Sequence, residues 1–221
     1  MEVGVWGRRY AFGSTPFCQS IETSGAEILA SPMALTGQAD GESMIWQNGR
    51  TSIEQTSETS LSLTQTAEND QATVHVKATV HFDDYAVFDC RIQARRQLSV
   101  QKLTLDIPLR AHYATLCQAI GVYPADPDIP MKRHFGGAVR DDLAFRFSPS
   151  IWLGDEQRGL CWQAKSDQDW HRANEQKSIE ILPRGDVTTF RANLVNVPTP
   201  LAAGDALDYK FAPVGDAFQT H

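Results

Sequence analysis

The chain has 221 residues, enough to bury the core of one large all-β domain or of two small ones, and we expect a single domain. Hydrophobic residues make up 42% and charged residues 21% of the chain, as in ordinary globular proteins, and no apolar run approaches the ~18 residues of a membrane span. The formal charge of −7 argues against a nucleic-acid partner, because such a partner requires a basic face. A neutral ligand or a protein surface is compatible with this charge.

The strands predicted for the first third follow from period-two alternation of apolar and polar residues, interrupted by turn dipeptides. The first strand is predicted over residues 3–12, with Trp6, Arg8, Tyr10 and Phe12 on one face. Another is predicted over residues 17–23, after which Ser24-Gly25 turns the chain into residues 27–29.

Asn48-Gly49 predicts a hairpin between residues 44–47 and 50–55, because a type I′ turn needs positive φ at both central positions. Asn69-Asp70 predicts a second turn. The strands on either side of it should be neighbours, each with one buried apolar face: Leu61 and Leu63, then Val74, Val76, Ala78 and Val80. Residues 52–66 are rich in Ser, Thr and Gln, which leaves a linker or a solvated edge strand open; β-branched alternation favours the strand.

The middle of the chain predicts strands over residues 87–94 and 100–108, the second ended by Pro108, which lacks an amide donor. One short helical turn is expected within residues 110–120. Residues 123–137 contain three prolines and Gly136-Gly137, and form the longest irregular stretch. A binding loop and a disordered segment are both open interpretations of it.

The final third predicts further strands, with a turn at residues 183–186: residues 142–147, 151–153, 160–164, 178–182, 188–195 and 207–211. Residues 213–221 have too little apolar content to add structure, so the domain is predicted over residues 1–212, with 213–221 as a tail or the start of a linker. The predicted core contains Trp6, Leu103, Leu105, Ile107, Phe145, Phe147, Trp152, Leu160 and Trp162. Together the strands predict an all-β, two-layer antiparallel β-sandwich with little helix.

Five segments, in this order, carry a resemblance to a known family: Val-Trp-Gly-Arg at 5–8, Ile-Pro-Leu at 107–109, Trp-Leu-Gly-Asp-Glu at 152–156, Arg-Gly-Leu at 158–160 and Ser-Asp at 166–167. The chain resembles the β-sandwich region of large bacterial proteins similar to glycoside hydrolase family 123, whose best-known members are β-N-acetylgalactosaminidases. This implies a supersandwich-like fold. In that family the sandwich precedes a catalytic (β/α)8 barrel, and nothing in this chain is similar to such a barrel.

Several signals of chemistry are missing from the sequence. The four cysteines, Cys18, Cys90, Cys117 and Cys161, are widely spaced without a Cys-x-x-Cys pair, so we expect no metal site; their disulfide status is open. There is no phosphate-binding loop or dinucleotide fingerprint, and no cofactor is expected. The N-terminus has no signal peptide, which leaves a secreted or periplasmic parent protein open.

The adjacent carboxylates Asp155-Glu156 are the first candidates for catalysis, because glycosidases commonly use two carboxyl groups. The family resemblance implies that the catalytic Asp-Glu pair belongs to the barrel. Here the pair lies between Gly154 and Gly159 at a predicted hairpin tip, with Arg158 close enough to keep a carboxylate charged. A general acid needs a desolvated site that raises its pKa, so we predict no catalytic residue in this chain.

An aromatic and acidic cluster is the candidate saccharide site: Trp170, Asp167, Asp169, His171 and Trp152. Sugars present an apolar face of C–H bonds and a rim of hydroxyls, which suits an exposed indole beside carboxylates. Trp152 and Trp162 lie on predicted strands, which favours a buried core position over exposure for both. Trp170 follows a polar run and is the best candidate for exposure.

These features favour a non-catalytic sandwich module of a polysaccharide-degrading glycoside hydrolase, which supports the catalytic barrel and contacts carbohydrate. A stand-alone carbohydrate-binding or protein-interaction domain is the alternative. An enzyme active by itself, with a mutarotase-like sandwich, is a third interpretation.

Overall fold

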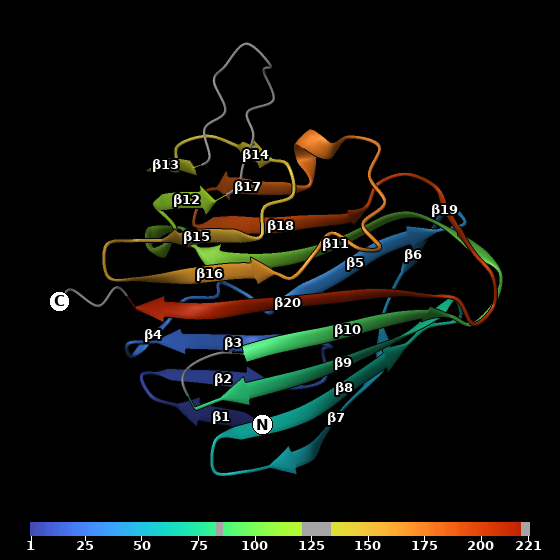
Figure 1. The fold of residues 1–221 in the computed structure, drawn as a ribbon, viewed down its shortest axis with the longest axis horizontal. Helices are drawn as coiled ribbons and strands as arrows, with labels where there is room; N and C mark the ends of the chain where they lie inside the picture. Colours follow the sequence, from blue (N-terminus) through green and yellow to red (C-terminus); the bar gives the residue numbers. More distant parts are fainter. Residues whose placement is uncertain (83–85, 121–133, 218–221) are drawn as a thin grey trace.

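The computed structural model describes residues 1–82, 86–120 and 134–217, and almost all regular structure in these residues is strand (Figure 1). Two 3₁₀ turns, η1 (Ala111–Tyr113) and η2 (Glu175–Lys177), are the helical elements of this part of the chain. Every pairing between neighbouring strands in its three sheets is antiparallel. The predicted all-β class and the short helical turn after Arg110 are confirmed.

The largest sheet has nine strands in the order β13-β12-β15-β16-β20-β10-β9-β8-β7. Their bounds in that order are His134–Ala138, Leu116–Ile120, Ser150–Gly154, Arg158–Ala164, Ala206–Ala217, Ala86–Ala94, Ala72–His81, Ser60–Glu68 and Gln47–Thr56. The centre of the sheet therefore joins β10, β20 and β16, which are far apart in sequence. The polar strand β7 lies at the edge, so the edge-strand prediction for residues 52–66 holds for residues 52–56 only. Residues 60–66 belong to β8, which lies between β7 and β9.

Two smaller sheets complete the domain. The seven-stranded sheet has the order β14-β17-β18-β11-β5-β6, with β19 paired to β11; the bounds are Leu143–Phe145, Ile179–Arg184, Val187–Val195, Leu98–Arg110, Ala34–Ala39, Glu42–Met44 and, for β19, Thr199–Leu201. The four-stranded sheet runs β1-β2-β3-β4, over Glu2–Val5, Arg8–Phe12, Cys18–Thr23 and Ala26–Glu27.

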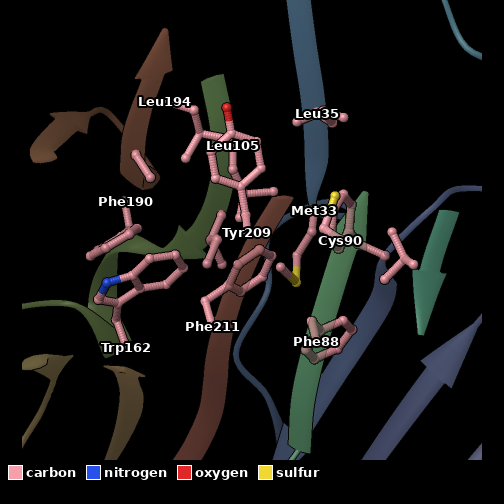
Figure 2. Close-up of a cluster of buried hydrophobic side chains, with 14 of the residues drawn as sticks. Met33, Leu35, Phe88, Cys90, Leu105, Trp162, Phe190, Leu194, Tyr209 and Phe211 are labelled. Atoms are coloured by element: carbon pink, nitrogen blue, oxygen red, sulfur yellow. The ribbon is translucent and has the colours of Figure 1, made fainter. Parts of the chain in front are cut away.

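The core lies between the nine-stranded sheet and the two smaller sheets (Figure 2). Trp162 of β16, with 0% exposure, lies 4.9 Å from Phe190 of β18 and 5.1 Å from Phe211 of β20 between ring centroids. On the other side, Phe88 of β10 lies 6.4 Å from Phe12 of β2. These contacts make the seven- and four-stranded sheets one layer of a sandwich and the nine-stranded sheet the other.

Most of the predicted core is buried, and three members differ. Leu103, Leu105, Ile107, Phe145, Leu160 and Trp162 are buried. Phe147 and Trp152 are only partly buried, and the prediction for Trp6 is wrong because its exposed fraction is 83%. Residues 3–12 do not form one strand: Gly7 has φ +74°, and the chain turns between β1 and β2, which places Trp6 at a hairpin tip.

Two of the predicted turns are confirmed, and the hairpin predicted at Asn48-Gly49 is wrong. Ser24-Gly25 and Asn69-Asp70 do turn the chain, and Leu63 of β8 pairs with Ala78 of β9 on a buried face as predicted. Asn48-Gly49 does not form a hairpin; it is an irregularity inside β7. A Cβ on Gly49 would lie 1.7 Å from the Ser14 carbonyl oxygen, so this glycine permits a close approach of two backbones.

Three boundaries also differ from the predictions. Pro108 does not end its strand. Its carbonyl accepts the Ala30 N–H at 2.8 Å, on the side away from β18. Because the nitrogen and carbonyl of one strand residue point to the same side, the missing N–H of Pro108 costs no hydrogen bond to β18. Strand β20 continues past Pro213 to Ala217, paired with β16, so residues 213–217 are not a tail. Strand β13 takes up residues 134–137 of the predicted irregular stretch; residues 123–133 lie outside the described part of the chain.

Candidate functional site

The outer face of the nine-stranded sheet is polar where its central strands meet. Alternate residues of β10 and β20 point away from the core, and the register places Asp89 opposite Lys210 and Arg91 opposite Asp208. Lys210 Nζ lies 2.8 Å from an Asp89 carboxylate oxygen, and Arg91 Nη1 lies 2.8 Å from Asp208 Oδ2. All four side chains are about half exposed, so each pair contributes at most about 1 kcal/mol to stability.

Two adjoining hollows lie on this face and share Lys165 and Lys210. The first, which we call the Gln163 hollow, has a volume of about 330 Å³ and is lined by Val87, Pro149, Gln163, Ala164, Lys165, Lys210, Phe211 and Ala212. The second, the Arg91 hollow, has a volume of about 360 Å³ and is lined by Asp89, Cys90, Arg91, Lys165, Ser166, Gln168, Asp208, Tyr209 and Lys210. Residues 165–171, which contain four of the five residues of the predicted saccharide site, therefore border both hollows.

Asp169 anchors that segment to β20. Its backbone has φ +61°, a conformation that Asp tolerates better than most residues. Its Oδ2 accepts the Asp208 N–H at 2.9 Å, and its carbonyl accepts the Tyr209 hydroxyl at 3.1 Å. Burial is the main cause that raises the pKa of Tyr209, so the hydroxyl stays protonated and remains a donor. The Asp169 carboxylate thus has a structural partner before any ligand binds.

Trp170 is half-buried and has neighbours on its ring. Phe147 meets it edge-on, with ring centroids 5.3 Å apart and an interplanar angle of 85°. The Arg172 guanidinium lies 5.4 Å from the ring centroid, in cation–π range. Arg172, whose side chain is only 9% exposed, donates to Asp167 Oδ2 at 2.8 Å and to Ser178 Oγ at 3.0 Å. Arg172 therefore joins Trp170 to Asp167 in one cluster.

His171 and Trp152 are the remaining residues of the predicted saccharide site. His171 is half-buried; its N–H donates to Leu194 and its carbonyl accepts from Asn196, which ties the segment to the end of β18. Trp152 is on β15, on the outer face, and packs along its own strand: a Cβ on Gly154 would lie 2.4 Å from Trp152 Cζ2. The structure thus brings Asp167, Asp169, Trp170 and His171 together, and places Trp152 on another strand.

Asp155 and Glu156 form the tip of the β15–β16 hairpin. Asp155 Oδ1 accepts the backbone N–H groups of Gln157 and Arg158, both at 2.7 Å, which stabilises the turn. The Arg158 side chain does not pair with either carboxylate; it donates to Gln157 Oε1 and lies over the Tyr113 ring. Glu156 is exposed. The pair is therefore at a solvated turn.

The family model described as glycoside hydrolase 123, third domain, matches residues 2–212. The chain belongs to this family. No curated protein sequence matches it. The predicted resemblance is confirmed, and the glycoside hydrolase 123 third domain accounts for nearly all of the chain.

Solved structures similar to this glycoside hydrolase 123 domain share its fold at low identity. A putative aldose 1-epimerase from Escherichia coli K12 is 7% identical, with 98% of each chain covered and a TM-score of 0.58. Galactose 1-epimerase from Lactobacillus acidophilus NCFM is 7% identical over 96% of this chain and 92% of that one, with a TM-score of 0.61. A variant glycoside hydrolase family 97 enzyme from a Pseudoalteromonas strain is 12% identical over 97% of this chain, which spans only 35% of that protein; the TM-score is 0.60.

The four cysteines of the glycoside hydrolase 123 domain are free thiols. Burial raises the pKa of Cys117 to about 12, so this thiol stays protonated at neutral pH. Within residues 1–82, 86–120 and 134–217, no three His, Cys, Asp or Glu side chains gather where they could hold a metal ion. None of the helical elements in those ranges is long and apolar enough to cross a membrane.

Sequence reasoning did not find the residues that form the two hollows on the glycoside hydrolase 123 domain. Asp89, Arg91, Asp208 and Lys210 occupy polar positions of correctly predicted strands, and their alternation could have assigned them to an outer face. The sequence alone does not show that β10 pairs with β20, because the paired residues are more than 110 positions apart.

Proposed function

We propose that this domain is a non-catalytic sandwich module of a glycoside hydrolase 123 protein, which supports a catalytic domain and contacts saccharide at the two hollows beside residues 165–171. Membership of the family supports the link to carbohydrate. Two proteins with this fold are named as sugar epimerases, and a third is named as a glycoside hydrolase. Because identity to them is at most 12%, these likenesses supply context for the fold and not the role.

The observation that carries the saccharide proposal is the lining of the Gln163 hollow. Val87 and Ala212 provide an apolar floor on the outer sheet face, and the Gln163 amide and two lysines stand at its border. Apolar surface with a few polar groups is the usual lining of a small-molecule site, and it matches the C–H face and hydroxyl rim of a sugar. The neighbouring Arg91 hollow adds further donors and acceptors through Ser166, Gln168 and Asp208.

In this proposal, Trp170 and the residues around it hold the segment 165–171 in position. Since the indole already contacts Phe147 and Arg172, we propose that it holds residues 165–171 against the sheet, and that its remaining exposed surface adds to the saccharide contact. Asp167, Asp169 and His171 keep the same segment in position. None of Trp170, Asp167, Asp169 and His171 lines either hollow; they lie in the segment that borders them, whereas Trp152 lies on β15, and we propose it as a peripheral contact on the same face.

Tryptophan fluorescence during titration with N-acetylgalactosamine and its oligosaccharides tests the proposal. We expect saturable binding in the wild type and about tenfold weaker binding after Trp170→Ala or Gln163→Ala, the usual effect of losing one good contact. Trp6→Ala is the matched control: it removes an exposed tryptophan from a hairpin tip on the other layer, and should leave the affinity unchanged. Absence of binding, or binding indifferent to both site variants, would contradict the proposed site.

A protein-interaction role is the second candidate, and exposed aromatic side chains favour it. Trp6 at the β1–β2 tip is 83% exposed and Phe82 at the end of β9 is 62% exposed. Large exposed aromatic side chains are enriched in protein interfaces. We propose these two residues as part of the contact with the catalytic domain, which is compatible with saccharide binding on the outer face of the nine-stranded sheet.

A further inference from the structure

Two lysines face each other across strands β16 and β20. Ala164 of β16 lies opposite Phe211 of β20, and the next pair in this register is Lys165 and Lys210. The Lys165 N–H donates to the Lys210 carbonyl at 3.3 Å. Both side chains line the Gln163 hollow and the Arg91 hollow. Like charges opposite each other destabilise a sheet, and an anion that lies near both relieves the repulsion.

The two lysines differ in their interactions with acidic side chains. Lys210 Nζ is bound by Asp89, at 2.8 Å from Oδ1 and 3.1 Å from Oδ2. In the part of the chain that the structure describes, the Lys165 ammonium has neither an ion pair nor a hydrogen bond. Among the residues that the structure describes, both lysines and no acidic residue line the Gln163 hollow, although the chain as a whole carries a charge of −7. The lysine end of this hollow is therefore positively charged, whereas the net charge of the chain is negative.

The rest of the Gln163 hollow is suited to the uncharged part of a ligand. Val87 and Ala212 lie on neighbouring strands and form the floor, and Pro149 forms a wall. Its volume of about 330 Å³ is at the lower end for ligand sites, which suits a short saccharide. An anionic group at the lysine end would leave the C–H face of its sugar ring above the apolar floor.

We infer that the domain binds an acidic saccharide, one bearing a carboxylate or sulfate group, with that group between Lys165 and Lys210. This inference rests on the proposed saccharide-binding function and specifies its ligand class. Lys165 supplies the charge-assisted hydrogen bond, which is shorter and stronger than a neutral one. Lys210, already bound by Asp89, contributes the second positive charge.

The test compares acidic and neutral oligosaccharides of equal length by isothermal titration calorimetry. The probes are an unsulfated chondroitin tetrasaccharide with uronate carboxylates, its sulfated form and the neutral, fully N-acetylated chitotetraose. We expect the acidic tetrasaccharides to bind at least about tenfold more tightly than the neutral one, and their affinity to fall as salt rises from ~50 to ~500 mM. Lys165→Gln should remove most of this advantage, since it keeps most of the length of the side chain and removes the charge.

Lys102→Gln is the matched control, because Lys102 is an exposed lysine of β11 in the other layer and its loss changes the net charge equally. It should leave all three affinities unchanged. Neutral and acidic tetrasaccharides binding equally, with Lys165→Gln indifferent, would overturn the inference and leave the saccharide-binding function intact. If none of the three binds, the proposed function fails and the inference fails with it. Unchanged melting temperatures of both variants would show that the comparison concerns folded protein.

Discussion

At the scale of single residues, the central tryptophan of the core and the exposed tryptophan of the first hairpin have opposite environments. Trp162 is fully buried between Phe190 and Phe211, whereas Trp6 is 83% exposed at a turn. Both were predicted to lie in the core, so the type of residue does not distinguish core from surface here. Packing between the two layers does.

Truncation of Trp162 is therefore predicted to be far more costly than truncation of Trp6. Trp162→Ala removes two ring contacts and leaves a cavity, which should lower the free energy of unfolding by about 3–5 kcal/mol. Trp6→Ala should change it by less than about 0.5 kcal/mol, as is usual for exposed positions. Urea denaturation monitored by circular dichroism measures both. A small loss for Trp162→Ala would mean that the tryptophan is not central to the core.

At the scale of elements, the alternation of residues predicted most strands, and local turn chemistry predicted some of their connections. Asp40-Gly41 forms a hairpin turn that was not among the predicted ones: φ is +52° and +82°, as a type I′ turn requires, and it joins β5 to β6. Asn48-Gly49 has the same kind of sequence signal but lies in an irregularity of β7, where the Ser14 backbone is close to Gly49; Asn48 has φ +54°, and Gly49 does not have the positive φ that a type I′ turn needs. The dipeptide alone cannot distinguish the two outcomes.

Asp40 is predicted to make the stability of this turn depend on pH. Its carboxylate accepts the Ser99 N–H at 2.9 Å and a hydrogen bond from Arg96 at 2.7 Å, and these bonds, the Ser99 one first, lower the pKa of Asp40 in the folded state. Since the unfolded value is about 3.9, the stabilisation is complete above it and is lost as the pH falls through the lower folded pKa. Asp40→Asn should thus be less stable than the wild type at neutral pH, and the difference should shrink as the pH falls through the folded pKa of Asp40.

Denaturant unfolding of the two proteins across that pH range measures the difference. Gly41→Ala is the control, because its strain at φ +82° does not involve a charge and should be independent of pH. A difference between Asp40→Asn and the wild type that persists at low pH would contradict this assignment.

At the scale of the whole molecule, the domain is a two-layer scaffold in which the nine-stranded sheet packs against the two smaller sheets. The Asp155-Glu156 pair is at a hairpin tip, and four charged residues of the outer face form two ion pairs across β10 and β20: Asp89 with Lys210, and Arg91 with Asp208. The proposed binding surface is formed by a sheet face, and the exposed aromatic residues Trp6 and Phe82 lie at strand ends. This arrangement suits an accessory role beside a catalytic domain.

We accordingly predict that the isolated chain does not hydrolyse glycosides. Release of the aryl group from an aryl N-acetyl-β-hexosaminide should remain at background, and Asp155→Asn or Glu156→Gln should leave that background unchanged. The reason is that neither carboxylate is in a desolvated site that would make it a general acid. Turnover that disappears in either variant would overturn the non-catalytic assignment, since a contaminating hydrolase would not respond to these substitutions.

The sequence by itself determined the all-β class, the positions of most strands and most of the core, because alternation with a period of two records which face of a strand is buried. It also placed Trp170, Asp167, Asp169 and His171 in one polar segment, since these residues are neighbours in the chain. Only the tertiary structure decided that Arg172 lies against Trp170, that Pro108 stays inside a strand, and that Trp6 is exposed. It alone brought Lys165, Lys210 and Val87 to one hollow. Cross-strand partners are set by the packing of whole sheets, and the local pattern of a strand does not specify which distant strand will lie beside it.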